Sequence, residues 1–243
     1  MFHMPLSFMW VPLIAYACLV GAWYVSNRYF DYEEDRISQG PEANGGKELL
    51  TISIVAFLVG LLLLITARSP VLPYLIFALL MLLYSCPISL FGKKRKLKQL
   101  LIVKNVYAAG LWHLTYASVL YFYTPLSLHT NFFLIYRSTF PFFLIMFMFE
   151  VLWNIRDMKG DKVVGTHTIP NTFPPIVAQI VMGVSLAIAA WCMCSYRVNI
   201  FVLGEFVFLF GLLFLASPKR SRWFFHSAIY VLCLFNITLA LTL

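Results

Sequence analysis

Residues 27–35 read NRYFDYEED, and they follow directly after an apolar segment and lead into polar sequence. Within them Asn27, Asp31 and Asp35 are spaced i, i+4 and i+8, so they share one stripe if the stretch is helical. Oxygen-bearing side chains gathered at the end of a membrane helix are costly unless a cation meets them. A hard divalent metal, a metal bound to phosphate, or Lys and Arg side chains would meet that need. The stretch therefore predicts a cation site at the end of a membrane helix.

A second polar stripe occurs more than a hundred residues later, again where an apolar run ends. Its members follow the helical spacing i, i+4, i+7 and i+11, and they are Glu150, Asn154, Asp157 and Asp161. Two such stripes, facing each other, could bridge metal ions that hold a diphosphate. We expect this function of the pair of stripes, not of either one alone.

The two stripes and one element between them resemble the UbiA superfamily of intramembrane prenyltransferases. The matching features are NxxxDxxxD at residues 27–35, YSCP at residues 84–87 and RDMKGDKVVGTHTIP at residues 156–170. The resemblance implies an all-α transmembrane bundle and a transferase of alkyl or aryl groups. It also implies Mg²⁺-dependent ionisation of an isoprenoid diphosphate. The resemblance further implies that a lipophilic acceptor, which is aromatic, a tetrapyrrole or a lipid, captures the carbocation.

The resemblance also assigns roles to individual residues. As catalytic carboxylates it implies Asp31, Asp35, Asp157 and Asp161. As metal ligands it implies Asn27, Asp31, Asp35, Asn154, Asp157 and Asp161. As contacts to the diphosphate it implies Asn27, Arg28, Lys93, Arg156 and Lys162. Many relatives have Asp at the position of Asn154, so this chain carries one negative charge fewer there.

Composition places the chain in a membrane. It is 61% hydrophobic and 12% charged with a mean hydropathy of +0.83, which is typical of a multi-pass helical membrane protein. The net charge of +8 could suggest nucleic-acid binding, but the cations lie in short loops between apolar runs. If successive loops alternate sides, 15 of the 18 Lys and Arg residues fall on one face. We therefore expect no nucleic-acid partner, and we expect the acidic motifs on the cytoplasmic side.

Eight apolar runs of about 20 residues predict eight helical spans in a single domain over residues 1–243. They cover residues 6–26, 49–67, 71–90, 100–123, 131–153, 174–195, 200–216 and 223–243. An even number of spans would place both termini opposite the acidic motifs. The resembling family has a further helix before its NxxxDxxxD helix, and we expect that leading helix to be absent here. A second copy of the chain or a membrane partner subunit would then cover the flank that it leaves.

Three further polar residues and two other functions enter the hypothesis. Glu205 lies within an apolar run, His113 lies on an apolar helix and His167 follows the second stripe. An intramembrane carboxylate is a candidate for function, whereas a histidine on an apolar helix is more often part of the core.

One alternative function is a terpene cyclase that traps the cation internally. The other is a noncatalytic homologue that serves as a structural subunit of a membrane complex.

Overall fold

The computed structural model describes residues 10–39, 45–86, 88–90, 93–95, 99–101, 103–122, 132–194, 200–217, 224–225 and 227. Over these residues the long helices are α1 (Trp10–Phe30), α3 (Lys47–Thr66), α4 (Leu72–Ser85), α5 (Val103–Phe122), α7 (Phe140–Val164), α9 (Pro175–Cys194) and α10 (Ile200–Leu215). The shorter elements are α2 (Tyr32–Gln39), α6 (Phe132–Ser138), α8 (Ile169–Thr172) and the strands β1 (Ile88–Leu90) and β2 (Lys93–Arg95).

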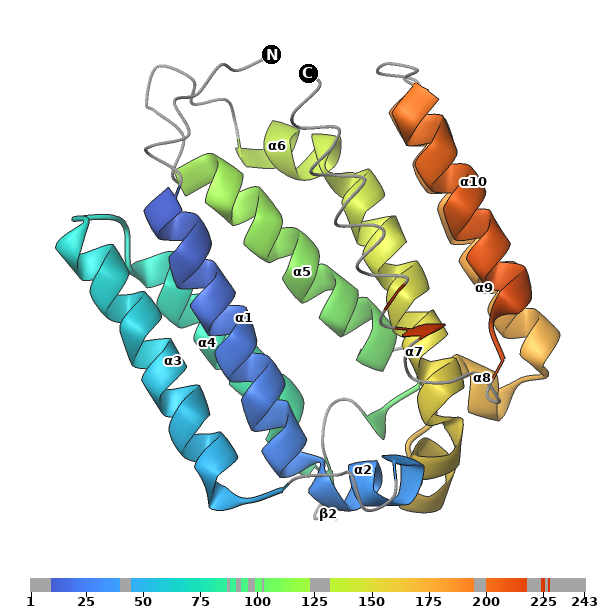
Figure 1. Ribbon diagram of the computed structural model, residues 1–243, viewed down its shortest axis with the longest axis horizontal. Helices are drawn as coiled ribbons and strands as arrows, with labels where there is room; N and C mark the ends of the chain where they lie inside the picture. The colour runs from blue at the N-terminus through green and yellow to red at the C-terminus, as the bar shows by residue number, and fades with distance from the viewer. Residues whose placement is uncertain are drawn as a thin grey trace.

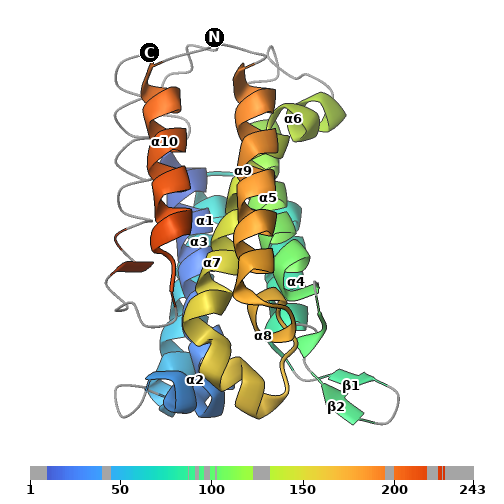
Figure 2. The same cartoon turned by 90° about the vertical axis from the view of Figure 1, so that its right-hand side faces the viewer.

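The long helices lie side by side in one bundle (Figures 1 and 2). α2 lies at one end of the bundle, beside the end of α7, whereas α6 lies at the opposite end. One buried cluster joins α7, α9 and α10, and it is centred on Met148, Leu152, Met182 and Leu209. A second joins α1, α3, α4 and α5 around Leu19, Leu64, Tyr74 and Leu111. α5 packs against α7 and connects the two clusters.

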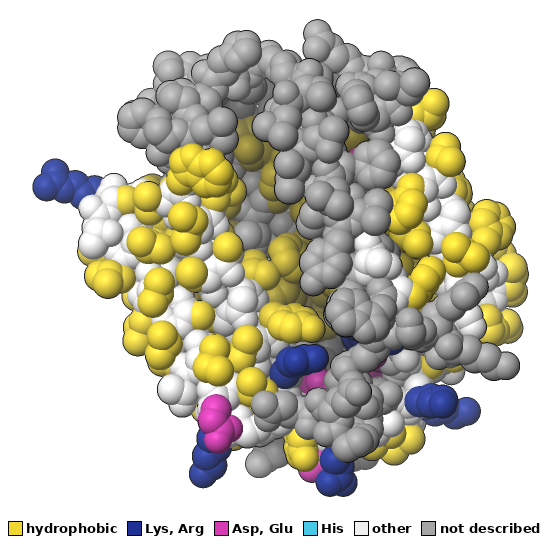
Figure 3. Space-filling model, viewed as in Figure 1, with side chains coloured by type: hydrophobic (Ala, Val, Ile, Leu, Met, Phe, Trp, Pro, Cys, Tyr) yellow, Lys and Arg dark blue, Asp and Glu magenta, His cyan; other side chains and the backbone are white. Residues whose placement is uncertain are grey.

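The outer surface of the bundle is apolar. Three helices are long and apolar enough to cross a membrane, namely Trp10–Phe30, Lys47–Thr66 and Pro175–Met193, and Leu72–Ser85 and Leu203–Leu215 are shorter apolar helices. On the face shown in Figure 3, hydrophobic side chains cover the sides, and most charged side chains gather at the end that holds α2. Helices satisfy their own backbone hydrogen bonds, as the hydrocarbon of a bilayer requires. The predicted all-α membrane bundle is confirmed, and the protein is an integral membrane protein.

The expected helix 71–90 is shorter than predicted. α4 ends at Ser85, and Cys86 has an extended ψ of 139°. Because the next residue is Pro87, the helical conformation is disfavoured at Cys86. Residues 88–90 instead form β1, which pairs with β2 in an antiparallel register that sets Ile88 opposite Arg95. The basic run therefore begins in a short hairpin, where the apolar pattern predicted only helix and loop.

The expected helix 131–153 is interrupted and then extended. It breaks at Thr139, between α6 and α7, and Pro141 lies in the first turn of α7 where its missing N–H is tolerated. α7 continues past the expected end at Trp153 to Val164, so it carries the whole second stripe. The eighth predicted span, apart from a few residues near its start, and both termini lie outside the described residues.

Candidate functional site

The first polar stripe crosses the junction of α1 and α2. The backbone N–H of Asp31 donates to the carbonyl of Asn27 at 2.9 Å, and that of Asp35 donates to Asp31 at 2.8 Å. These i to i−4 hydrogen bonds continue the helical spacing across the break at Asp31. Asn27 lies near the end of α1 and Asp35 in α2, while Asp31, only 5% exposed, lies between them.

The second stripe lies entirely on α7. Asn154 is 1% exposed and Asp161 is 4% exposed, and Glu150 is also buried. Gly165 ends the helix with a φ of 74°, a left-handed conformation that glycine adopts without strain. The N–H groups of Gly165 and Thr166 both donate to the carbonyl of Asp161. This cap fixes the backbone at the last carboxylate of the stripe.

The fold brings the two stripes to the same end of the bundle. α2 packs against α7, and both views show these helices together (Figures 1 and 2). The charge of Asp35 acts on Arg156 across this contact. Burial disfavours the charged guanidinium, but the hydrogen bonds and charge of Asp157 outweigh it, so the pKa of Arg156 is raised. The helices that carry Asp35 and Arg156 therefore pack together at this end of the bundle.

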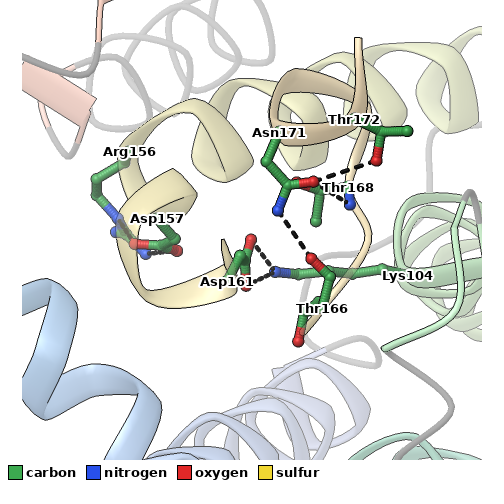
Figure 4. Close-up of polar contacts among 8 residues, drawn as sticks. All are labelled: Lys104, Arg156, Asp157, Asp161, Thr166, Thr168, Asn171 and Thr172. Atoms are coloured by element: carbon green, nitrogen blue, oxygen red, sulfur yellow. Dashed lines mark hydrogen bonds and ion pairs between the residues drawn. The ribbon is translucent and has the colours of Figure 1, made fainter. Parts of the chain in front are cut away.

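Two carboxylates of the second stripe are held by cations (Figure 4). The Lys104 Nζ of α5 donates to both Oδ1 and Oδ2 of Asp161 at 3.1 Å. Arg156 donates through Nε and Nη2 to the two oxygens of Asp157 at 2.7 Å, the forked geometry typical of guanidinium and carboxylate. The Lys104–Asp161 pair is nearly buried, and its two opposite charges compensate each other there.

The YSCP element contacts the first stripe. Ser85, which is fully buried, donates through Oγ to Asn27 Oδ1 at 2.9 Å. The neighbouring Tyr84 ring lies 5.7 Å from Trp23 of α1 and is stacked 5.6 Å from Tyr107 of α5. The element thus orients the amide of Asn27 and supplies an aromatic wall beside it.

Two buried amides near the ion pairs lack hydrogen-bond partners among the described residues. They are the side-chain nitrogen of Asn154 and both polar atoms of Asn105, the residue after Lys104. Unsatisfied buried amides are rare in folded proteins, and a ligand is one explanation for them. The sequence hypothesis included Asn154, but it assigned no site role to Lys104, Asn105 or Ser85. The local signals were the position of Ser85 in the YSCP element and the presence of Lys104 near the start of an apolar run.

The other expected residues lie in several places. Arg28 lies over the Tyr24 ring, 5.5 Å from its centre, and Lys162 is exposed on the last turn of α7. Lys93 is in β2, and its side chain lies outside the described part of the chain. Glu205 is buried in α10, and His167 is exposed.

His113 belongs to the opposite end of the bundle. Its Nε2 lies 2.9 Å from Thr139 Oγ1 and 3.1 Å from the carbonyl oxygen of Tyr136. It is a buried histidine that links α5 to the start of α7, in keeping with the expected core role.

Within the described residues, no group of three or more His, Cys, Asp or Glu side chains lies close enough to hold a metal ion. Asp157 and Asp161 are instead paired with Arg156 and Lys104. The donor set is nonetheless composed of carboxylate and amide oxygens, which are the ligands that Mg²⁺ accepts. The residues therefore fit a magnesium–diphosphate complex by their chemistry and by their common end of the bundle.

A comparison with protein families identifies the family to which the chain belongs. The UbiA prenyltransferase family model matches residues 3–229. The chain belongs to the UbiA prenyltransferase family. Searches of curated proteins and of solved structures gave no match. Membership makes this chain a membrane prenyltransferase in the broad sense, and it confirms the resemblance carried by the two acidic motifs and the YSCP element.

Proposed function

We propose that this UbiA-family protein transfers an isoprenoid chain from its diphosphate to a lipophilic acceptor at the end of the bundle formed by α1, α2 and α7. The observation that carries the proposal is the contact of α2 with α7, which sets both acidic motifs at one polar end of an apolar bundle. An isoprenoid diphosphate matches this division into a polar end and an apolar bundle, because its head is charged and its tail is apolar.

Mg²⁺ is the cofactor that we propose. The residues that would hold it are Asn27, Asp31 and Asp35 from the first stripe and Asn154, Asp157 and Asp161 from the second. When bound, it would neutralise the departing diphosphate. The unpartnered amide nitrogen of Asn154 would donate to a phosphate oxygen, since a buried donor gains most from such an acceptor.

Cations of the chain itself complete the diphosphate site. Lys104 and Arg156 already lie on site carboxylates, and both can donate further hydrogen bonds to phosphate oxygens. Arg28 lies near the end of α1 and Lys162 near the end of α7. We propose both of them, together with Lys93, as outer contacts to the diphosphate. These positive charges stabilise the diphosphate as the C–O bond breaks and its electron pair leaves with the phosphate.

The apolar helices would hold the chain and exclude water from the allylic cation. Trp23, Tyr84 and Tyr107 form the aromatic wall next to Asn27, and ring faces stabilise a nearby cation. The cation is then captured by a nucleophilic atom of the acceptor, which releases its proton. We propose an aromatic, tetrapyrrole or lipid acceptor.

The test is turnover by the purified protein in nanodiscs with Mg²⁺, a panel of geranyl, farnesyl and geranylgeranyl diphosphates, and one acceptor of each class. An acceptor-dependent prenylated product, identified by mass spectrometry, is the expected result. A hydrocarbon released without acceptor would instead indicate a cyclase. Failure to bind or consume any diphosphate would indicate a structural subunit.

We also propose that the polar end faces the cytoplasm, because 15 of the 18 Lys and Arg residues are expected there. Single cysteines in place of the exposed Lys162 and Arg68, in a background without native cysteines, test this with a membrane-impermeant maleimide. Only the Arg68 position should react in intact cells. Labelling of both positions from outside would contradict the topology.

The final part of the proposal is a partner on the outer face of α1, either a second copy or another membrane subunit. Leu13, Ile14 and Tyr24 are exposed there. α1 is supported on its other side by close packing against α3, so part of the order at the first stripe comes from within the chain. A photocrosslinker at Leu13 in native membranes should yield a protein adduct, and lipid adducts alone would refute the partner.

A further inference from the structure

A hollow lies at the end of the bundle opposite the acidic stripes. Its volume is about 360 Å³, and its lining includes Phe133 and Arg137 of α6, Phe140 of α7 and Trp191 of α9. Figure 2 shows α6 and the last turns of α9 at this end, away from α2. The size falls within the usual range for small-molecule sites in proteins. Neither the acidic motifs nor the YSCP element contributes to it.

The hollow combines one cation with aromatic walls. The Arg137 side chain is exposed and forms no ion pair with an acidic residue in the described ranges. If successive loops alternate sides, only three of the 18 Lys and Arg residues are expected at this end of the bundle. A guanidinium beside apolar rings binds most tightly to an anion that also carries an apolar group. The anion then pairs with the guanidinium, and the apolar group contacts the rings.

The walls of the hollow are fixed from behind. The Tyr136 ring, which also lines the hollow, lies 4.3 Å from the buried His113 ring, and Phe140 lies 6.4 Å from it. Phe140 is also stacked on Phe143 at 5.5 Å. Because these rings are already packed in the bundle, a ligand would not have to order them, and preorganised walls raise affinity.

Trp191 places the hollow at the membrane surface. Its side chain is 73% exposed near the end of a helix that can cross a membrane, which is where tryptophan is enriched at the boundary between lipid and water. A site that opens there contacts lipid headgroups directly. A free phosphate ion could contact the guanidinium, but it has no apolar part to match the aromatic lining of the hollow.

We propose that this hollow binds one anionic phospholipid from the leaflet opposite the acidic stripes. The Arg137 guanidinium meets the phosphate, and the rings of Phe133, Phe140 and Trp191 contact the glycerol and the upper part of an acyl chain. The site is separate from the diphosphate site and does not depend on the proposed reaction.

Native mass spectrometry of delipidated protein with added phosphatidylglycerol tests the proposal. The wild-type chain should bind one such lipid more tightly than it binds phosphatidylcholine. Arg137→Gln should weaken phosphatidylglycerol binding about fivefold, the loss expected for one cation at an anionic headgroup. Arg68→Gln is the matched control, since Arg68 is an exposed cation that does not line the hollow, and it should bind as the wild type does.

Two further variants separate the roles of charge and rings. Arg137→Lys keeps the charge but not the forked donors, so its affinity should lie between wild type and Arg137→Gln. Trp191→Leu should weaken phosphatidylglycerol and phosphatidylcholine alike, because it removes a ring that contacts the shared part of both lipids.

Equal binding by Arg137→Gln and Arg68→Gln would overturn the proposal. Displacement of phosphatidylglycerol by millimolar inorganic phosphate would also overturn it, since it would identify a free-anion site. Melting curves without lipid are measured for each variant. If Arg137→Gln does not fold, the binding of Arg137→Lys and Trp191→Leu tests the proposal instead.

Discussion

The two ends of the contact between α5 and α7 use different chemistry. At one end Lys104 donates to both oxygens of Asp161 at 3.1 Å, and at the other His113 Nε2 lies 2.9 Å from Thr139 Oγ1. Both contacts are largely buried, and both fix one helix against the other. A neutral hydrogen bond does so without desolvating two charges, whereas a buried ion pair carries a large desolvation cost. The charged end is therefore the one that calls for a functional explanation.

The largest expected effect is the loss of turnover when a stripe carboxylate is removed. Asp161→Ala or Asp31→Ala should lower kcat/KM by about a thousandfold, which corresponds to several kcal/mol of lost stabilisation of the leaving diphosphate. Glu33→Ala is the control, because Glu33 is an exposed residue of α2 that does not belong to the stripe. Turnover in nanodiscs is the measurement. An unchanged rate in both Asp variants would remove the stripes from the active site.

The second largest effect is expected when the Lys104 cation is removed from the charged end of the contact between α5 and α7. Lys104→Met should lower the free energy of unfolding by roughly 3 kcal/mol, because the buried Asp161 carboxylate loses its ion pair with the Lys104 ammonium. Diphosphate affinity should fall as well. Thermal unfolding and binding of a non-hydrolysable diphosphate analogue measure the two effects. Lys162→Met, which removes an exposed cation from the last turn of α7, should change stability little, and an equal loss of stability in both variants would refute a special role of Lys104.

A smaller effect is expected from Ser85, which orients Asn27 without carrying charge. Ser85→Ala removes one buried hydrogen bond of about 1 kcal/mol, so KM for the diphosphate should rise about fivefold. Ser53→Ala is the matched control. Its Oγ also makes a buried hydrogen bond, at 2.7 Å to the carbonyl of Ala22, and its loss should lower the melting temperature without changing KM. A KM unchanged by Ser85→Ala would show that the YSCP serine only packs.

The smallest effect on activity is expected at the neutral end. Thr139→Val removes the hydroxyl beside His113 and should lower the free energy of unfolding by about 1 kcal/mol. Because this contact lies at the far end of α7, kcat/KM should stay within twofold of the wild type. A tenfold loss of activity with an unchanged melting curve would contradict the division of the helix pair into a functional and a structural end.

Predictions from the sequence succeeded where the signal was local. The spacing of Asn27, Asp31 and Asp35 holds because i to i−4 hydrogen bonds continue through the α1–α2 junction. The breaks were less visible. Residues 131–153 read as one apolar run, yet the helix stops at Thr139, and α4 ends early because Pro87 disfavours helix at Cys86. Hydrophobic content locates a span well, but it says little about where the backbone turns inside it.

The membrane class, the family and the spacing of the two acidic stripes could be predicted from the sequence, because composition, motifs and helical periodicity are properties of neighbouring residues. The contacts of Lys104 with Asp161 and of Ser85 with Asn27 join residues 57 and 58 positions apart, and they emerged from the folded structure. Such contacts depend on the packing of whole helices. The apolar pattern of α5 does not predict which helix packs against it or which of its faces makes the contact. In a membrane, lipid covers an apolar face as well as another helix does.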